Sequence, residues 1–270
     1  MKLSIITVNL NDKDGLQKTI DSVVSQTFKD FEWIVIDGGS TDGSKELIEQ
    51  YAEHFAYWVS EPDKGIYNAM NKGIRVAKGE YCLFLNGGDC FYEDHTLEKV
   101  VSAGLDADIV YGYQLVENNG ERTILNQPRT LSFETFYNGN INHSGGSFIR
   151  TSLFERYGLY DENLRIVSDF KFCIQAIILG DATTKYVDIL VSVFDGNGIS
   201  SNMEEHLKER AIVLNSLIPK KILVDYEKMD KYREMLIQRE KQVRSSASYR
   251  LGKIILCPIK KIMALLHISK

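Results

Sequence analysis

Several residue types and patterns are scarce in this sequence, and each scarcity excludes a class of protein. Only four cysteines occur among 270 residues, and Cys82, Cys90, Cys173 and Cys257 are too scattered to form paired metal ligands. No stretch of about 18 uncharged apolar residues occurs, so we expect no transmembrane helix. Met1 and Lys2 lead directly into an apolar run, without the pattern of a secretory signal. We therefore expect a protein of a reducing, cytosolic compartment.

Basic residues are in the minority overall, but not along the whole chain. The net charge of −5 argues against a protein dedicated to nucleic-acid binding. Residues 220–270 contain 13 Lys and Arg against 5 Asp and Glu, whereas residues 1–219 contain 19 against 32. This split predicts an acidic body with a basic tail, which is typical of contact with a membrane or polyanion. The length allows one sizeable core and an appendage.

Short apolar runs alternate with helical patterns over the first ninety residues. Strands are predicted at residues 3–8, 31–36, 57–60 and 81–85, and helices at residues 13–26, from just after residue 40 or 41 to about 55, and at 65–77. Ser40 or Thr41 is the predicted cap of the second helix. This alternation predicts an α/β fold with a doubly wound, predominantly parallel sheet and right-handed crossovers.

The rest of the chain has a weaker pattern. Strands are predicted at residues 108–113 and 185–194, a helix at residues 169–179, and irregular structure at residues 114–150. From residue 204 to about 243 the pattern is helical and strongly charged. We therefore divide the chain into an α/β domain (1–203), a charged helical extension (204–244) and a basic amphipathic tail (245–270).

Polar residues follow three of the predicted strands where each strand ends. Asn9 and Asn11 follow the first strand, Asp37 the second, and Asn86-Gly-Gly-Asp89 the fourth. Because the carboxyl ends of parallel strands share one edge, these groups are expected in one crevice. A carboxylate there can hold a hard divalent cation, and glycines let a diphosphate approach the backbone. For the last segment alone, a polar turn that caps a strand is an equal alternative.

These segments resemble the family 2 glycosyltransferases with the GT-A fold, across roughly residues 3–200. The resemblance rests on ordered motifs whose spacing is specific to the family. It implies a bacterial enzyme that builds capsule, exopolysaccharide or lipopolysaccharide repeats. The matching motifs are SIITVNLN (4–11), VIDGGSTDG (35–43), DKGIYNAMNKG (63–73), LFLNGGD (83–89), NH (142–143), YGLYDE (157–162) and VSD (167–169).

The resemblance assigns nucleotide-binding roles to the first two strand ends. Val8 matches a backbone position that contacts the nucleotide, and Asn11 lies in the same loop. Asp37 matches the first acid of an Asp-Asp-Gly-Ser loop and would bind the base or ribose. Gly38 replaces the second acid, which leaves base recognition open. The alternative for Asp37 is a simple helix-entry turn.

Two further segments are implied to bind the donor. Asp63 and Lys64 match the loop that closes over the nucleotide, although Lys64 is equally well explained as a solvated surface cation. Asp89 matches the last acid of the metal motif and is the predicted ligand of Mg²⁺ or Mn²⁺. Asn86, a ribose or phosphate partner, and Gly88 replace the other acids of that motif.

The resemblance places the chemistry at residue 169. Asp169 matches a general base that faces the acceptor, and the alternative is a helix-capping aspartate. His143 is implied to lie beside the acceptor and donor sugar, and residues 195–201 to form a lid over the diphosphate. We expect Asp37, Asp89 and Asp169 to surround one cavity.

The implied reaction moves a sugar from a nucleotide diphosphate to an acceptor hydroxyl with inversion. The resemblance suggests a UDP-hexose or UDP-N-acetylhexosamine donor and a lipid-linked saccharide acceptor. The alternatives are a nucleotide-sugar-binding protein with impaired catalysis and, last, a nucleotidyltransferase, whose Gly-rich basic signature is absent. A homodimer is left open.

The tail at residues 245–270 combines apolar and basic residues. Pro258 would kink a helix there, and the segment is too short to span a bilayer. It predicts a helix in an anionic membrane interface, hence a cytoplasmic protein peripheral on the inner face of the cell membrane. The alternative is docking on the body or on a partner subunit.

Overall fold

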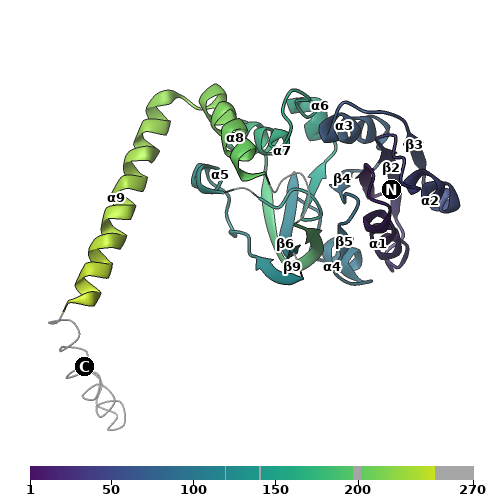
Figure 1. Ribbon diagram of the computed structural model, residues 1–270, viewed down its shortest axis with the longest axis horizontal. Coiled ribbons are helices and arrows are strands. Elements are labelled where there is room, and N and C mark those ends of the chain that lie inside the picture. The colour runs from purple at the N-terminus through teal and green to yellow at the C-terminus, as the bar shows by residue number, and fades with distance from the viewer. Residues whose placement is uncertain (119, 140, 197–201, 247–270) are drawn as a thin grey trace, which may run out of the picture. The chain divides into compact units, whose positions relative to one another are not determined.

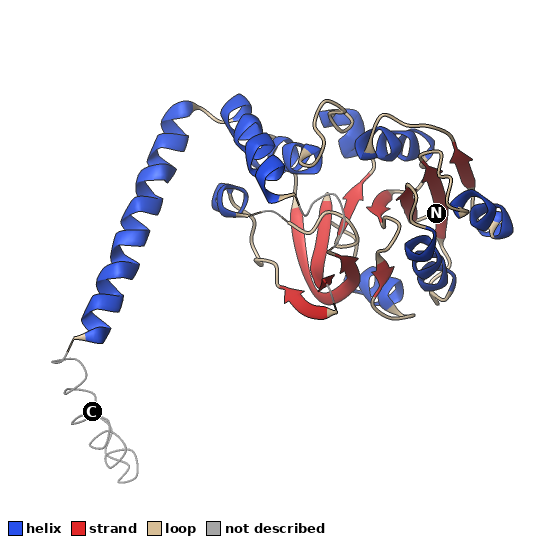
Figure 2. Ribbon diagram, in the orientation of Figure 1, coloured by secondary structure: helices blue, strands red, loops and turns tan. Residues whose placement is uncertain are grey.

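A mixed β-sheet organises the chain (Figures 1 and 2). The computed structural model describes residues 1–118, 120–139, 141–196 and 202–246. In these ranges nine strands follow the order β3-β2-β1-β4-β8-β6-β9-β5, with β7 paired to β6. The strands are β1 (Leu3–Asn9), β2 (Phe31–Asp37), β3 (Tyr57–Ser60), β4 (Tyr81–Phe84), β5 (Cys90–Phe91), β6 (Ile109–Asn118), β7 (Glu121–Leu125), β8 (Ser147–Arg150) and β9 (Thr184–Asp195).

The first four strands in sequence are parallel, as predicted. β1 lies between β2 and β4, and β3 pairs with the outer side of β2. Asn9 is in register with Asp37, so the carboxyl ends of β1 and β2 meet at one edge. β8 runs antiparallel to both β4 and β6 and makes the sheet mixed.

Helices cover both faces of the sheet, with α3 and α6 on one side and α1 and α4 on the other (Figure 1). Leu3 and Ile5 of β1 pack with α1, α2 and α4 in the main core. Ile6 points to the other face, where a Cβ added at Gly73 of α3 would lie 2.5 Å away. The helices are α1 (Lys13–Val24), α2 (Ser44–Gln50), α3 (Ile66–Val76), α4 (Thr96–Ala103), α5 (Phe133–Asn138), α6 (Ser152–Tyr157), α7 (Ser168–Cys173), α8 (Met203–Leu217) and α9 (Lys220–Ser245).

The structure corrects the expectation of irregular structure at residues 114–150. β6 continues to Asn118, and a turn with Gly120 at φ +81° joins it to β7. α5 and β8 follow, and Ser132 caps α5 through a reciprocal bond with Thr135. Every residue of β7 is exposed. Neither face of this strand is buried, so its sequence need not show the alternation of apolar and polar residues that predicts a strand.

Three helix boundaries also differ from the prediction. α2 begins at Ser44, because the Ser40 side chain is bonded to Asp37 and the Thr41 backbone to Asn11. The helix predicted at residues 169–179 is α-helical only to Cys173 and continues as a π-helical turn, Ile174–Ile178. The charged helical pattern is interrupted at Pro219, between α8 and α9.

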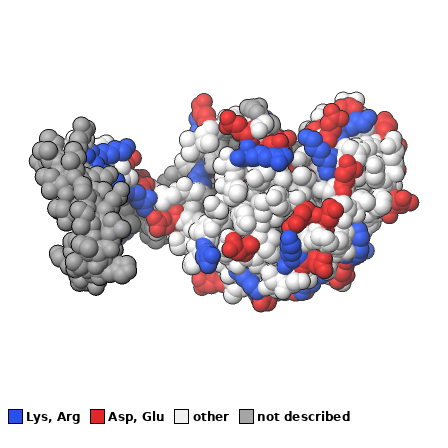
Figure 3. Space-filling view, turned by 90° about the horizontal axis from the view of Figure 1, so that it is seen from below, with Lys and Arg blue, Asp and Glu red and all other residues white. Residues whose placement is uncertain are grey.

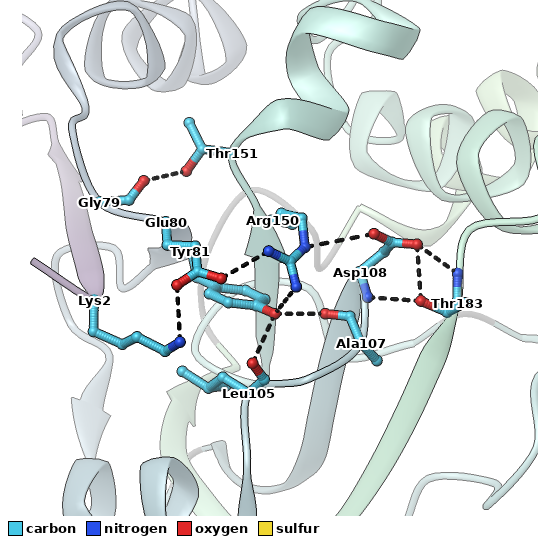
Figure 4. A network of polar contacts seen from close by, with 10 residues as sticks. All are labelled: Lys2, Gly79, Glu80, Tyr81, Leu105, Ala107, Asp108, Arg150, Thr151 and Thr183. Carbon is cyan, nitrogen blue, oxygen red and sulfur yellow. Dashed lines mark hydrogen bonds and ion pairs between the residues drawn. The ribbon is translucent and has the colours of Figure 1, made fainter.

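A polar network joins the strands at the edge of the sheet opposite the carboxyl ends of β1, β2 and β4 (Figure 4). Arg150 Nη1 lies 2.7 Å from Glu80, Nη2 donates to Tyr81 Oη at 2.7 Å, and Nε lies 3.5 Å from Asp108. Asp108 in turn accepts from the backbone and hydroxyl of Thr183, which precedes β9. We call Lys2, Glu80, Tyr81, Asp108, Arg150 and Thr183 the far-edge network.

The chain divides into two compact units, Met1–Val213 and Leu214–Lys270. In the first unit, acidic and basic side chains are interspersed on the face drawn in Figure 3. In the second, α9 is a 26-residue helix with mostly exposed side chains. Among the described residues, no helix has the length and apolarity needed to cross a bilayer. The predicted amphipathic tail lies, from residue 247 on, outside the described residues.

Candidate active site

A cavity of about 510 Å³ opens where β1 and β4 end. Its walls come from the loops after these strands, from α3 and α7, and from the segment before β8. Six of the predicted site residues line it: Val8, Asp63, Asn86, Asp89, His143 and Asp169. The other four, Asn11, Asp37, Lys64 and Gly88, lie outside its lining.

Asp89 is a buried carboxylate at the floor of the cavity, with 2% of its surface exposed. Its Oδ2 accepts from Ser144 Oγ at 2.9 Å and from Asn86 N at 3.3 Å, and its Oδ1 accepts from Asp195 N at 3.1 Å. Burial raises the pKa of Asp89 to about 7, although these bonds oppose the rise. The carboxyl therefore changes charge near neutral pH, where an added cation would favour the ionised form.

The surroundings of Asp89 fit a hard divalent cation. Asn86 Oδ1 is buried without a hydrogen-bond partner in the described structure, and it belongs to the loop that holds Asp89. A Cβ added at Gly88 would lie 3.2 Å from Asp195 Oδ2 and 3.4 Å from Asp12 Oδ2, so two more carboxylates converge there. Oxygen donors of this kind suit Mg²⁺ and Mn²⁺. The described residues contain no ready-made group of three or more His, Cys, Asp or Glu ligands.

Asp169 faces the same cavity from the first turn of α7, with 18% of its side chain exposed. Its Oδ1 accepts from the hydroxyl of Tyr67 on α3 at 2.8 Å. Its Oδ2 lies 3.9 Å from His143 Nδ1, which is beyond hydrogen-bonding distance. The carboxyl is thus oriented through one oxygen, while the other adjoins the cavity wall at His143.

His143 is buried between aromatic rings beside Asp169. Its ring stacks on Phe84 with centroids 5.0 Å apart, and its Nε2 lies 2.5 Å from Tyr160 Oη. Burial lowers the pKa of His143, and the charge of Asp169 only partly opposes this effect. The imidazole is therefore neutral at neutral pH and acts as a polar wall of the cavity.

Asp37 does not line the cavity, contrary to the expectation that three acids surround it. The side chain is fully buried and accepts from Ser40 Oγ at 2.5 Å, Ser60 Oγ at 2.7 Å and Asn9 Nδ2 at 3.0 Å. Burial alone would raise the pKa of Asp37, but these bonds and that of the Ser40 backbone lower it. Both oxygens therefore hold the neighbouring loops in place, and nucleotide binding by Asp37 stays a prediction.

The neighbouring loops carry the other predicted nucleotide residues. Asn11 has a φ of 51° and accepts from Thr41 N at 2.8 Å, which ties the first loop to the second. A Cβ added at Gly38 would lie 2.6 Å from Asp63 Oδ2. The Asp63 carboxylate thus fills the space that a second acid at position 38 would need. Lys64 is exposed and lies outside the cavity, as in the surface alternative.

Several residues that the sequence did not reveal as site residues hold Asp169 in place. Tyr67 bonds to Asp169 and to Ile166 O, across about a hundred positions of sequence. Asn71 of the same motif donates to Tyr160 O and to Glu162, at 2.9 Å each. Motif DKGIYNAMNKG therefore anchors the loop that leads to α7. The predicted lid begins at the cavity with Asp195, but residues 197–201 lie outside the described residues.

The chain has an α/β fold with a mixed sheet and an acid-lined cavity at the carboxyl ends of the parallel strands. This is the arrangement of a GT-A-type glycosyltransferase fold. Solved structures support this class. TarS 1–349 from S. aureus in complex with UDP-GlcNAc superposes with a TM-score of 0.65 at 18% identity, covering 82% of this chain and 69% of that one. Mannosyltransferase PcManGT from Pyrobaculum calidifontis, in complex with GDP-Man and Mn²⁺, gives 0.55 at 14%, covering 99% and 88%.

The sequence comparisons identify the family. Residues 4–158 match the family described as glycosyl transferase family 2, and the chain belongs to this family. It is 33% identical over 216 residues to the uncharacterized glycosyltransferase Rv1514c of Mycobacterium tuberculosis, covering 75% of this chain and 78% of the relative. It is 31% identical over 207 residues to a PGL/p-HBAD biosynthesis glycosyltransferase of Mycobacterium bovis, covering 74% and 78%.

Proposed function

We propose that this glycosyltransferase moves a sugar from a nucleotide diphosphate, UDP in the first instance, to an acceptor hydroxyl with inversion. One observation carries the proposal. Asp89 and Asp169 face the same cavity, one from the loop after β4 and the other from the start of α7. The binding of UDP-GlcNAc by TarS supports a UDP-sugar, a hexose or N-acetylhexosamine, although PcManGT binds GDP-Man.

Asp169 would act as the general base. The acceptor oxygen attacks the anomeric carbon, the bond from that carbon to the diphosphate breaks, and the hydroxyl proton moves to Asp169. Because Tyr67 occupies Oδ1, Oδ2 is the oxygen that would take the proton. Neutral His143, buried beside Asp169, would border the reacting sugar without competing for that proton. A single displacement of this kind inverts the anomeric configuration.

Asp89, Asn86 and Asp195 would hold the divalent cation. Mg²⁺ or Mn²⁺ at this place would neutralise charge on the leaving diphosphate as a Lewis acid. The unpartnered Asn86 Oδ1 and the pKa of Asp89 near 7 support the assignment. PcManGT contains Mn²⁺ together with its nucleotide sugar, which supports the same pairing here.

The acceptor proposed is a lipid-linked saccharide of a surface polysaccharide. Its support is the sequence of residues 245–270, which combines basic and apolar residues, as do helices that lie on anionic membranes. Such a contact would hold the enzyme on the inner face of the cell membrane, close to its acceptor. Membrane contact and a homodimer stay predictions from the sequence.

The test is acceptor-dependent release of nucleoside diphosphate from a panel of UDP- and GDP-sugars, with polyprenyl-diphosphate sugars as acceptors. NMR of the product gives the anomeric configuration, which we expect to be inverted. Asp169→Asn should lower turnover by about 10²–10⁴-fold, with unchanged nucleotide affinity by calorimetry.

Asp108→Asn is the matched control, because Asp108 belongs to the far-edge network. Its turnover per folded molecule should equal that of the wild type. A retained anomeric configuration, or wild-type turnover in Asp169→Asn, would exclude the mechanism.

A further inference from the structure

The hydroxyl of Tyr67 lies between two hydrogen-bond acceptors. It is 2.6 Å from the carbonyl oxygen of Ile166 and 2.8 Å from Asp169 Oδ1. A phenol carries one hydrogen, and a carbonyl oxygen can only accept. Tyr67 can therefore donate to only one of the two at a time, and the charge on Asp169 decides which acceptor is stronger.

An ionised carboxylate is the better acceptor, because hydrogen bonds to charged groups are the stronger ones. While Asp169 is ionised, Tyr67 donates to Oδ1. Once Asp169 has taken a proton at Oδ2, the Ile166 carbonyl becomes the competitive acceptor, and the hydrogen can turn to it. Both states keep the same positions of the heavy atoms, so the base can change its charge without moving.

On the basis of the proposed function, we propose that Tyr67 is a positioning residue, which orients the Asp169 carboxyl and stabilises its ionised form. It fixes Oδ1, leaves Oδ2 for the acceptor hydroxyl, and favours the ionised form of the carboxyl at rest. The ionised form is the one that can accept a proton. Loss of the Tyr67 hydroxyl should therefore make Asp169 a base that is active only at higher pH.

The partners of Tyr67 are held firmly. The backbone N–H groups of Ile166 and Val167 donate to Glu209 Oε2 of α8, at 2.8 and 3.2 Å, so the peptides on both sides of Ile166 are held, including the one that contains its carbonyl. The Tyr67 ring is buried and packs against Tyr160 with centroids 5.6 Å apart. Burial and the charge of Asp169 hold the pKa of Tyr67 well above its usual value, so the hydroxyl stays protonated.

The other titratable groups that Asp169 influences are neutral near pH 7. Burial lowers the pKa of His143 and His206, and it raises the pKa of Tyr160 and Cys173 well above their usual values. Charged side chains on the adjoining α8 and on the loop before α7 have partners of their own. These are Arg210 on the Phe136 and Gly139 carbonyls, Glu209 on the backbone at 165–167, and Arg165, whose Nη1 lies 3.5 Å from Glu205. Among the described residues, the Tyr67 hydroxyl is thus the side-chain donor that contacts the Asp169 carboxyl within hydrogen-bonding distance.

The test compares Tyr67→Phe with Tyr157→Phe. Tyr157 Oη also donates to a carbonyl, that of Gly180 at 2.8 Å, but it is outside the cavity lining. The pKa of Asp169 is read by ¹³C NMR titration of aspartate-labelled protein, with the resonance assigned from Asp169→Asn. The pH profile of kcat/KM is measured alongside.

In Tyr67→Phe we expect the pKa of Asp169 and the acid limb of kcat/KM to move up together by about one pH unit. Below that limb the rate should fall roughly tenfold, and at alkaline pH it should approach the wild-type rate. Tyr157→Phe should move neither quantity. A rate loss that is equal at every pH, or an unchanged pKa of Asp169, would overturn the inference.

A second variant covers the case in which Tyr67→Phe does not fold. Placing 3-fluorotyrosine at position 67 strengthens the hydroxyl as a donor, so the pKa of Asp169 should then fall; an unchanged or raised pKa would contradict the inference. The NMR titration needs no substrate. Wild-type turnover in Asp169→Asn would therefore refute the proposed base, whereas an unmoved pKa in the Tyr67 variants would refute only this inference.

Discussion

Acidic side chains gather at both edges of the sheet, but their partners differ. In the far-edge network, Glu80 pairs with Lys2 and Arg150, and Asp108 with Arg150 and Thr183 (Figure 4). At the cavity, Asp12, Asp63, Asp89, Asp169 and Asp195 line the wall. Of the described Lys and Arg residues, only Arg165 joins them there.

The pKa values follow this difference. The hydrogen bond from Lys2, with Arg150 beside it, lowers the pKa of Glu80. Burial would raise the pKa of Asp108, but the Thr183 bonds and Arg150 lower it. Burial raises the pKa of Asp89, and the nearby Asp195 charge adds to the rise. One edge thus contains its own counter-charges, whereas at the other the pKa of the buried Asp89 is raised, as is common in binding sites.

The largest expected difference between the edges is in ligand binding. Asp89→Asn should weaken the affinity for UDP in the presence of Mg²⁺ or Mn²⁺ by about 10–100-fold, because a neutral amide replaces the charged ligand. Calorimetry with and without metal measures this loss. Without metal, the affinities of variant and wild type should be close.

Asp108→Asn serves as the matched change at the far edge and should leave metal-promoted UDP binding intact. Equal affinities of Asp89→Asn and the wild type in the presence of metal would remove Asp89 from the metal site.

A smaller effect is expected from breaking the far-edge network at its centre. Arg150→Met keeps an aliphatic chain over the Tyr81 ring, which now lies 4.8 Å from the guanidinium, but removes the bonds to Glu80 and Tyr81. We expect the free energy of unfolding to fall by about 1–2 kcal/mol, since Glu80 is partly exposed and regains water, and the buried Tyr81 hydroxyl still has the Leu105 and Ala107 carbonyls as acceptors. Urea denaturation measures this loss.

Turnover of folded Arg150→Met should match that of the wild type, because the network lies at the opposite edge from the cavity. Unchanged stability together with reduced turnover would show that the two edges are coupled.

The fold was predictable where a segment has a clear pattern of apolar residues. β1, β2 and β4 are short runs rich in apolar residues, and almost all of their side chains are buried, as that pattern predicts. β7 was missed because all of its side chains face solvent, and a strand of that kind is specified by its pairing with β6. Gly120, with its positive φ, belongs to the turn between these two paired strands.

The site was predictable as a set of acids but not as a set of contacts. Asp89 and Asp169 were recognised from motifs and strand ends, and both line the cavity. Asp37 was recognised in the same way, yet donors from positions 9, 40 and 60 surround it. Tyr67 and Glu209 reach partners about 100 and 43 positions away in the chain. Partners at such separations become visible only when the chain has folded.

The smallest predicted effect concerns the pH dependence of the free energy of unfolding. The carboxyls at the two edges should contribute to it with opposite signs. Without metal, the raised pKa of Asp89 means that the folded state binds more protons than the unfolded state between about pH 4 and 7. Stability should therefore fall as pH rises through that window. The lowered pKa of Asp108 has the opposite sign, so its contribution is present above the unfolded pKa and is lost as pH falls below it.

Urea denaturation from pH 3 to 8 measures both slopes. Each carboxyl contributes at most one proton, or about 1.4 kcal/mol per pH unit, and we expect roughly half of that or less. Asp89→Asn should remove the decline toward pH 7, and Asp108→Asn should remove part of the loss in acid. If the two variants changed the pH dependence in the same direction, the contrast between the far-edge network and the proposed cation site would fail. Adding Mn²⁺ and UDP to the wild type should also remove the decline, because the bound cation favours ionised Asp89.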